Sequence, residues 1–87
     1  MKELIFTVKD PAGLHARPAG LLVKEAQRLS DRVTISKGEK SADLKKLLSV
    51  MGLGIRHGET VTIRIEGKDE EASFSHLERV LRDTFGN

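Results

Sequence analysis

Apolar and polar side chains alternate along the first part of the chain. Leu4, Phe6 and Val8 take every second position, and this period predicts a strand that buries one face and exposes the other. The run Asp-Pro-Ala-Gly at 10–13 ends the pattern, because proline and glycine favour turns. The same alternation returns over 61–65 and predicts another strand of this kind.

The middle of the chain predicts two further strands. Val33 and Ile35 alternate with polar residues over 31–36, which indicates a strand with one buried face. The run Lys-Gly-Glu at 37–39 reads as a turn. The short polar run 40–42 is expected to pair back on the preceding strand across this turn.

Two longer segments show the spacing of amphipathic helices. Apolar residues recur at this spacing over 18–29, and Pro18 suits a first helical turn, where its missing N–H is not needed. Asp-Glu-Glu at 69–71 places acids at the start of the last helix, where the helix dipole favours them. An apolar stripe then runs down to Gly86. The stripe consists of Phe74, Leu77, Val80, Leu81 and Phe85.

A short helix is expected over 44–51. Asp43 is placed to cap its first turn, and Gly52 and Gly54 follow its last residue, where glycine commonly ends a helix. The order along the chain is therefore strand, helix, strand, strand, helix, strand, helix. This order is close to a split βαβ arrangement with one added helix, which belongs to the α+β class.

Such an arrangement predicts that the helices cover one face of the sheet and that water covers most of the other. Polar residues at alternate strand positions fit the solvated face. They are Thr7, Thr34, Thr62 and Arg64. At 87 residues the chain can build one hydrophobic core and not two, so we interpret residues 1–87 as a single domain without a linker.

Composition narrows the environment and the partners. The chain has no cysteine, which removes disulfides and thiolate chemistry and fits a reducing compartment, so a cytoplasmic location is expected. The N-terminal segment lacks the unbroken apolar run of a signal peptide or membrane span, so no membrane insertion is expected. A net charge of +2 from 15 basic and 13 acidic residues, with three phenylalanines as the aromatic residues, disfavours nucleic-acid binding.

The segment 13–19 (Gly-Leu-His-Ala-Arg-Pro-Ala) carries the candidate chemistry. It places His15 just before a helix, whose first N–H groups have no internal partner and attract anions. A phosphoryl group on His15 would meet the amides of Ala16 and Arg17 and the Arg17 guanidinium. A neutral imidazole is nucleophilic near neutral pH, and its bond to phosphorus is labile enough for onward transfer. The alternative is a histidine that simply caps the helix, and position alone favours that interpretation.

The same segment resembles the active-site signature of HPr, the histidine phosphocarrier family of the phosphoenolpyruvate:sugar phosphotransferase system. Residues 45–54 are similar to the family's second helix and exit turn, and 66–72 to the join into its last helix. The resemblance implies an HPr-like open-faced β-sandwich, in which a four-stranded antiparallel sheet carries three helices on one face. It also implies phosphorylation of His15 at Nδ1 by Enzyme I and transfer to the IIA domains of sugar permeases. Such a carrier is a stoichiometric intermediate and not an enzyme in its own right.

The resemblance further implies a docking surface for these partners on the first helix and the short second helix. Its residues are Leu14, Arg17, Gly20, Leu21, Lys24, Leu47, Leu48 and Met51. The short helix carries more large apolar groups than a core face readily uses, which fits a partly exposed patch, with ordinary core packing as the alternative. The basic stripe of the first helix favours steering toward acidic partners, with a plain solvated face as the alternative.

One position departs from many Gram-positive members of the family. These members have a regulatory serine at the start of the second helix, and the matching residue here is Lys46. Ser49 is out of register with that position, and Ser41 precedes the helix. We therefore expect no seryl phosphorylation by the family's kinase.

The other two histidines look ordinary. His57 lies in an Arg-His-Gly turn and His76 on the polar side of the last helix. Neither is spaced with His15 as a metal site, so no metal and no cofactor are expected. No serine sits on a nucleophile elbow, which argues against a hydrolase.

Several functional alternatives stay open at this point. Within the family, the chain fits either general sugar uptake or a specialised regulatory branch, and the sequence does not separate them. An alternative from another class is a non-phosphorylated interaction module that binds regulators through its apolar patch. Docking alone would not need His15 and Arg17, which speaks against that module. We expect the protein to be a monomer.

Overall fold

The structure is a computed structural model that describes residues 1–85. Its elements follow the predicted order. They are β1 (Lys2–Thr7), α1 (Ala16–Gln27), β2 (Arg32–Lys37), β3 (Lys40–Asp43), α2 (Leu47–Met51), β4 (Thr60–Glu66) and α3 (Glu70–Phe85). Gly86, which was expected to end the last helix, lies outside the described residues. Within that part of the chain, no helix is both long and apolar enough to cross a bilayer.

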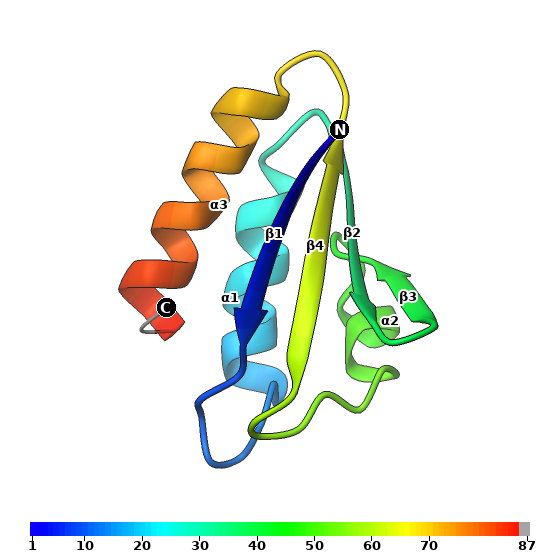
Figure 1. The fold of residues 1–87 in the computed structure, drawn as a ribbon, viewed down its shortest axis with the longest axis vertical. Coiled ribbons are helices and arrows are strands. Elements are labelled where there is room, and N and C mark those ends of the chain that lie inside the picture. Colours follow the sequence, from blue (N-terminus) through cyan, green and yellow to red (C-terminus); the bar gives the residue numbers. More distant parts are fainter. Residues whose placement is uncertain (86–87) are drawn as a thin grey trace.

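The strands form one antiparallel sheet in the order β1-β4-β2-β3. β4 therefore lies between the first two strands of the sequence, as Figure 1 shows. Phe6 is opposite Val61 in the pairing of β1 with β4, and Ile35 is opposite Ile63 in the pairing of β2 with β4. All four side chains are buried. The register thus aligns the apolar positions of neighbouring strands on one face, as their alternation predicted.

The three helices cover that apolar face, and the other face of the sheet is open (Figure 1). The residues predicted for the solvated face are all at least partly exposed. One of them, Arg64, donates to Glu3 Oε2 across the strand pair at 2.9 Å. Ile5 lies on the same face with 69% of its surface exposed, so this strand presents one apolar group to solvent. The fold is the predicted α+β open-faced sandwich.

α1 and α3 pack on the sheet through the residues that their spacing predicted. Ala19, Leu22 and Ala26 of α1 are fully buried, and so is Leu77 of α3. Phe85, in the last described turn of α3, packs partly buried against this core. Burial of these faces supplies the main driving force for holding both helices on the sheet.

α2 begins later than the sequence predicted. Leu44 was expected in its first turn, but its N–H donates to Val33 O at 2.9 Å, and its side chain is buried. Asp43 was expected to cap the helix, but its Oδ1 accepts from Lys45 N–H at 2.9 Å and closes a turn instead. The N-cap position falls on Lys46, whose side chain makes no capping bond. Pairing with β2 therefore takes precedence over helix formation in this segment.

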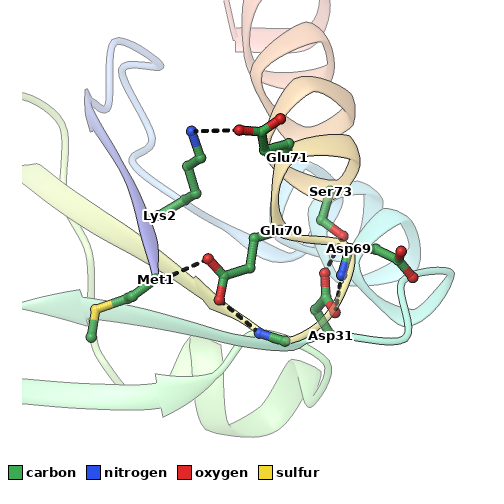
Figure 2. Close-up of polar contacts among 8 residues, drawn as sticks. Met1, Lys2, Asp31, Asp69, Glu70, Glu71 and Ser73 are labelled. Atoms are coloured by element: carbon green, nitrogen blue, oxygen red, sulfur yellow. Dashed lines mark hydrogen bonds and ion pairs between the residues drawn. The ribbon is translucent and has the colours of Figure 1, made fainter.

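A buried carboxylate connects the start of β2 to the start of α3 (Figure 2). Asp31 accepts from Ser73 Oγ–H at 2.8 Å and from Asp69 N–H at 3.2 Å. Gly67 passes so close that a Cβ there would collide with Asp31 Oδ1. The Gly67 N–H donates to Glu70 Oε2 at 2.9 Å. These contacts hold the first turn of α3 at the end of the molecule opposite the loop that carries His15 (Figure 1).

Candidate functional site

His15 is the N-cap residue of α1, and its side chain does not cap the helix. Its backbone is extended, with φ −85° and ψ −177°, and the imidazole makes no capping hydrogen bond. The His15 carbonyl accepts the first helical bond, from Ala19 N–H at 3.0 Å. The side chain is 42% exposed. The ring is therefore left available for chemistry, which disfavours the interpretation of His15 as a simple helix cap.

The first turn of α1 presents two unpaired amides beside this ring. Ala16 and Arg17 occupy the first two helical positions, where an N–H has no partner inside the helix. No backbone acceptor pairs with either amide within residues 1–85. Pro18, in the third position, has no N–H and is buried. Two donors with partial positive charge thus remain at the position where an anion on His15 would sit.

A glycine sets the path of the chain into His15. Gly13 has a φ of +73°, and a Cβ there would lie 2.6 Å from Ile55 O. The next residue, Leu14, donates its N–H to the same carbonyl at 3.0 Å and buries its side chain. The backbone before His15 is therefore pressed against the loop that precedes β4, and only glycine permits this approach.

Asp10 lies next to His15, and His57 lies next to Asp10. The sequence did not point to either of them. Asp10 Oδ2 is 3.4 Å from His15 Nε2, and Asp10 Oδ1 accepts from Ala12 N–H at 2.9 Å. His57 Nδ1 is 3.2 Å from the Asp10 carbonyl oxygen. The Ala12 N–H and the neighbouring His15 together lower the pKa of Asp10 below its ordinary value. Asp10 and His57 are 47 residues apart, so no local spacing in the sequence predicts their contact.

Four residues of the expected docking surface lie on one side of α1. Arg17, Gly20, Leu21 and Lys24 are spaced three, four and seven positions along the helix, so they share a face. Arg17 and Lys24 are exposed, and 48% of the Leu21 surface is exposed. This face begins at Arg17, two positions after His15.

α2 contributes the apolar part of the same surface. Leu48 is 87% exposed and Leu47 is 38% exposed. Met51 is partly buried and packs against the core. Leu14 is different from the rest of the set, because only 5% of its surface is exposed. The assignment of Leu14 to the docking surface is therefore corrected: its side chain belongs to the core, where the Gly13 turn directs it.

Lys46 is exposed at the N-cap of α2. The residue before it, Lys45, makes two hydrogen bonds to the end of α1 and the residues that follow it. Gln27 Nε2–H donates to Lys45 O at 2.8 Å, and Lys45 Nζ donates to Leu29 O at 2.6 Å. These bonds hold the segment before α2 against the end of α1. No group of three or more potential metal-ligating side chains occurs within residues 1–85.

Comparison with known proteins agrees with this geometry. The family model described as the PTS HPr component phosphorylation site matches residues 2–83. The chain belongs to the HPr family. The match spans the whole of the sheet and includes His15. HPr proteins are phosphocarriers of the phosphotransferase system, and this chain is one of them by family.

Individual HPr proteins are similar over almost the whole chain. Phosphocarrier protein HPr of Lysinibacillus sphaericus is 42% identical over 83 residues, which cover 95% of this chain and 94% of the relative. The solved histidine-containing phosphocarrier protein of a mycoplasma matches with a TM-score of 0.90 and 35% identity, covering 95% and 94% of the two chains. HPr-C-His from Thermoanaerobacter tengcongensis matches with a TM-score of 0.88 and 36% identity, covering 100% and 98%.

Another matched structure is an HPr dimer from Thermoanaerobacter tengcongensis, with a TM-score of 0.75 and 36% identity, covering the full length of both chains. Because that HPr was solved as a dimer, the oligomeric state of the present chain does not follow from its family. The monomer expected from the sequence stays a prediction.

Glu59 supports the loop on which the HPr site rests. Its Oε1 accepts from Arg56 N–H at 2.6 Å and lies 3.2 Å from Lys37 Nζ, and its carbonyl accepts from Val8 N–H at 2.9 Å. The Arg56 N–H, followed by the Lys37 ammonium, lowers the pKa of Glu59 below its ordinary 4.5, against the opposing effect of burial. The folded state therefore binds this proton less tightly than the unfolded state does.

Replacing Glu59 with Gln should lower the free energy of unfolding at neutral pH. Because the folded pKa is the lower one, the stabilisation is present above 4.5 and is lost as the pH falls through the folded value. Urea unfolding of wild type and Glu59→Gln over a pH series should show a difference that narrows below 4.5 and closes in acid. Glu78→Gln, at an exposed position of α3, is the control. A Glu59→Gln difference that persists in acid would contradict the assignment.

Proposed function

We propose that this protein accepts a phosphoryl group from phospho-Enzyme I on Nδ1 of His15 and donates it to IIA proteins or domains in the cytoplasm. The observation that carries the proposal is an uncapped, half-exposed imidazole followed directly by two unpaired helix amides. Membership of the HPr family supports the same assignment. The protein would act as a stoichiometric carrier, with its partners driving the chemistry.

The first turn of α1 suits a phosphohistidine. The amides of Ala16 and Arg17 would donate to two phosphoryl oxygens, and charge-assisted bonds of this kind are about twice as strong as neutral ones. The Arg17 guanidinium is exposed and makes no ion pair within the described residues. It is therefore available to stabilise the charge that passes between His15 and a partner.

The surface around His15 suits docking of two partner proteins in turn. α1, which has an exposed basic and apolar face, is in contact with α2, which carries the exposed leucines. Bonds from Gln27 and Lys45 hold the two helices together. Apolar groups provide the centre of such an interface, and Arg17 and Lys24 favour an acidic partner surface. Because His15 lies at the surface, a partner's active site can close over it.

Incubation with phosphoenolpyruvate and a cognate Enzyme I should add one phosphoryl group in an acid-labile, base-stable linkage. Intact-protein mass spectrometry and acid treatment measure this label. His15→Ala should abolish the label, because the nucleophile is lost. His76→Ala should retain it, because His76 is remote from the N-terminus of α1: its Nε2 lies 2.7 Å from Oε1 of Glu25, in the last turn of that helix. A label that survives in His15→Ala would exclude the proposal. Failure of the wild type to be labelled by several Enzyme I preparations would instead favour the non-phosphorylated interaction module.

Arg17→Ala should slow both acceptance and donation by at least about tenfold, since positioned cations in phosphoryl transfer are worth orders of magnitude. Rapid-quench transfer kinetics with Enzyme I and with an IIA domain measure the two steps. The free energy of unfolding should change by less than about 0.5 kcal/mol, because the side chain is exposed. Arg32→Ala, at an exposed position in β2, controls for the loss of one positive charge. Unchanged transfer in Arg17→Ala would show that the helix amides suffice.

The protein should not be labelled by ATP and the serine kinase that acts on Gram-positive HPr proteins. Lys46 offers no hydroxyl, and its charge opposes the helix dipole at the start of α2, where a phosphoserine would be favoured. Lys46→Ser should create an acceptor, whereas Lys46→Ala should stay unlabelled, which separates the gain of a hydroxyl from the loss of a charge. Mass spectrometry locates the phosphate. Phosphate on Ser49 or Ser41 of the wild type would show that the regulatory site has moved.

A further inference from the structure

The carboxylate of Asp10 is placed between the backbone and the reactive ring. Its Oδ1 accepts from Ala12 N–H at 2.9 Å, and its Oδ2 faces His15 Nε2 at 3.4 Å. An ionised carboxylate has acceptors and no donor. The Ala12 N–H keeps the carboxylate ionised by lowering the pKa of Asp10. The nitrogen that faces Asp10 is therefore the one that carries the hydrogen of neutral His15.

Two donors fix the backbone of Asp10 in this position. Gly13 N–H donates to the Asp10 carbonyl at 2.8 Å, and His57 Nδ1 lies 3.2 Å from the same oxygen. Because a carbonyl oxygen only accepts, this geometry places the hydrogen of His57 on Nδ1. His57 lies in the loop before β4. The next residue in this loop, Gly58, donates its N–H to Val8 O at 2.7 Å. The support for Asp10 thus comes from a segment that is remote in sequence.

We propose that Asp10 is a positioning residue that holds neutral His15 as the Nε2–H tautomer, so that Nδ1 presents its lone pair to the incoming phosphoryl group, and that His57 holds Asp10 in place. This inference rests on the proposed function, because it assigns Nδ1 as the acceptor. A hydrogen on Nδ1 would block the attack, whereas a hydrogen on Nε2 leaves the lone pair free. A carboxylate plays the same part for the histidine of serine proteases, where it fixes the tautomer and stabilises the imidazolium.

The transfer step balances with Asp10 in this role. The lone pair of Nδ1 forms the bond to phosphorus, while the bond from phosphorus to the donor atom of the partner breaks and returns its electron pair to that atom. No proton leaves the His15 ring, because the hydrogen stays on Nε2 beside Asp10. The ring becomes positively charged as the new bond forms, and the Asp10 carboxylate lies on the side where that charge is stabilised. Donation to the next partner reverses each of these changes.

Asp10→Asn tests the tautomer directly. The Asn carbonyl can keep the bond to Ala12 N–H, which turns the Asn amide N–H toward His15 Nε2. A donor at that place favours the Nδ1–H tautomer, the opposite of the wild-type preference. Long-range proton–nitrogen NMR, on ¹⁵N-labelled protein at pH about 8.5, where an ordinary imidazole is neutral, distinguishes the two tautomers. Wild type should be mainly Nε2–H, and Asp10→Asn should shift toward Nδ1–H.

Phosphoryl acceptance by Asp10→Asn should fall by about two- to fivefold, the size expected for an exposed ion pair. Glu66→Gln is the charge-matched control, because Glu66 is exposed at the opposite end of β4 (Figure 1). Both its tautomer ratio and its rate should equal those of wild type. A slower Asp10→Asn protein with an unchanged tautomer ratio would show an effect of charge alone and would overturn the assignment, as would an unchanged ratio with an unchanged rate.

His57→Ala should move the tautomer ratio in the same direction as Asp10→Asn and by a smaller amount. His57→Gln, which can still donate to the Asp10 carbonyl, should restore the wild-type ratio. Ratios equal to wild type in His57→Ala would remove His57 from the proposal. The NMR measurement needs no partner protein, so the two claims are tested separately. A wild type that is never phosphorylated would contradict the proposed function. The tautomer ratio would still decide whether Asp10 sets the tautomer of His15.

Discussion

The N-terminus of α1 is held against the sheet by backbone hydrogen bonds between two loops, and the position of His15 depends on them. Leu14 N–H donates to Ile55 O, and Val8 is bonded to both Gly58 and Glu59. The approach is close enough that a Cβ at Gly13 would lie 2.6 Å from the Ile55 carbonyl. These bonds continue the pairing of β1 with β4 beyond the ends of both strands. The pairing of edge strand β1 with β4 therefore sets the position of the His15 ring.

The same framework determines which helix surfaces are left for partners. Burial of the apolar strand faces brings all three helices to one side of the sheet, with α1 in contact with both α2 and α3. α1 uses one face for the core, so its Arg17 to Lys24 face is free to meet a partner. α2 is too short to bury all of its apolar residues, and 87% of the Leu48 surface remains exposed. The exposed apolar surface that we propose for docking thus exists because the core can cover so little of α2.

The polar groups of the site lie at the surface, and this position suits reversible transfer. Asp10 and His15 each have about 42% of the side chain exposed, so water screens the interaction between them. In this protein the strongest positional constraints are on the backbone, through Gly13, and the side chains add modest electrostatic preferences. In the carrier role that we propose, the protein would fix the geometry and its partners would drive the transfer.

The sequence by itself determined the order of the elements and was enough to propose His15 as the reactive residue. Period-2 alternation and helical spacing are local properties, so they assign Phe6, Ile63 and Leu77 to the core without any knowledge of long-range contacts. His15 and Arg17 could be proposed as site residues because the start of a helix is also signalled locally, here by Pro18.

Only the tertiary structure decided features that depend on residues distant in sequence. Leu44 was expected in a helix, but its N–H donates to Val33 O and its side chain is buried, because this segment continues from β3 alongside β2. Leu14 was expected on the surface, yet the Gly13 turn against Ile55 directs it into the core. Asp10 and His57 meet across 47 positions of the chain. No periodicity encodes such a contact, since it is created when the sheet places β1 beside β4.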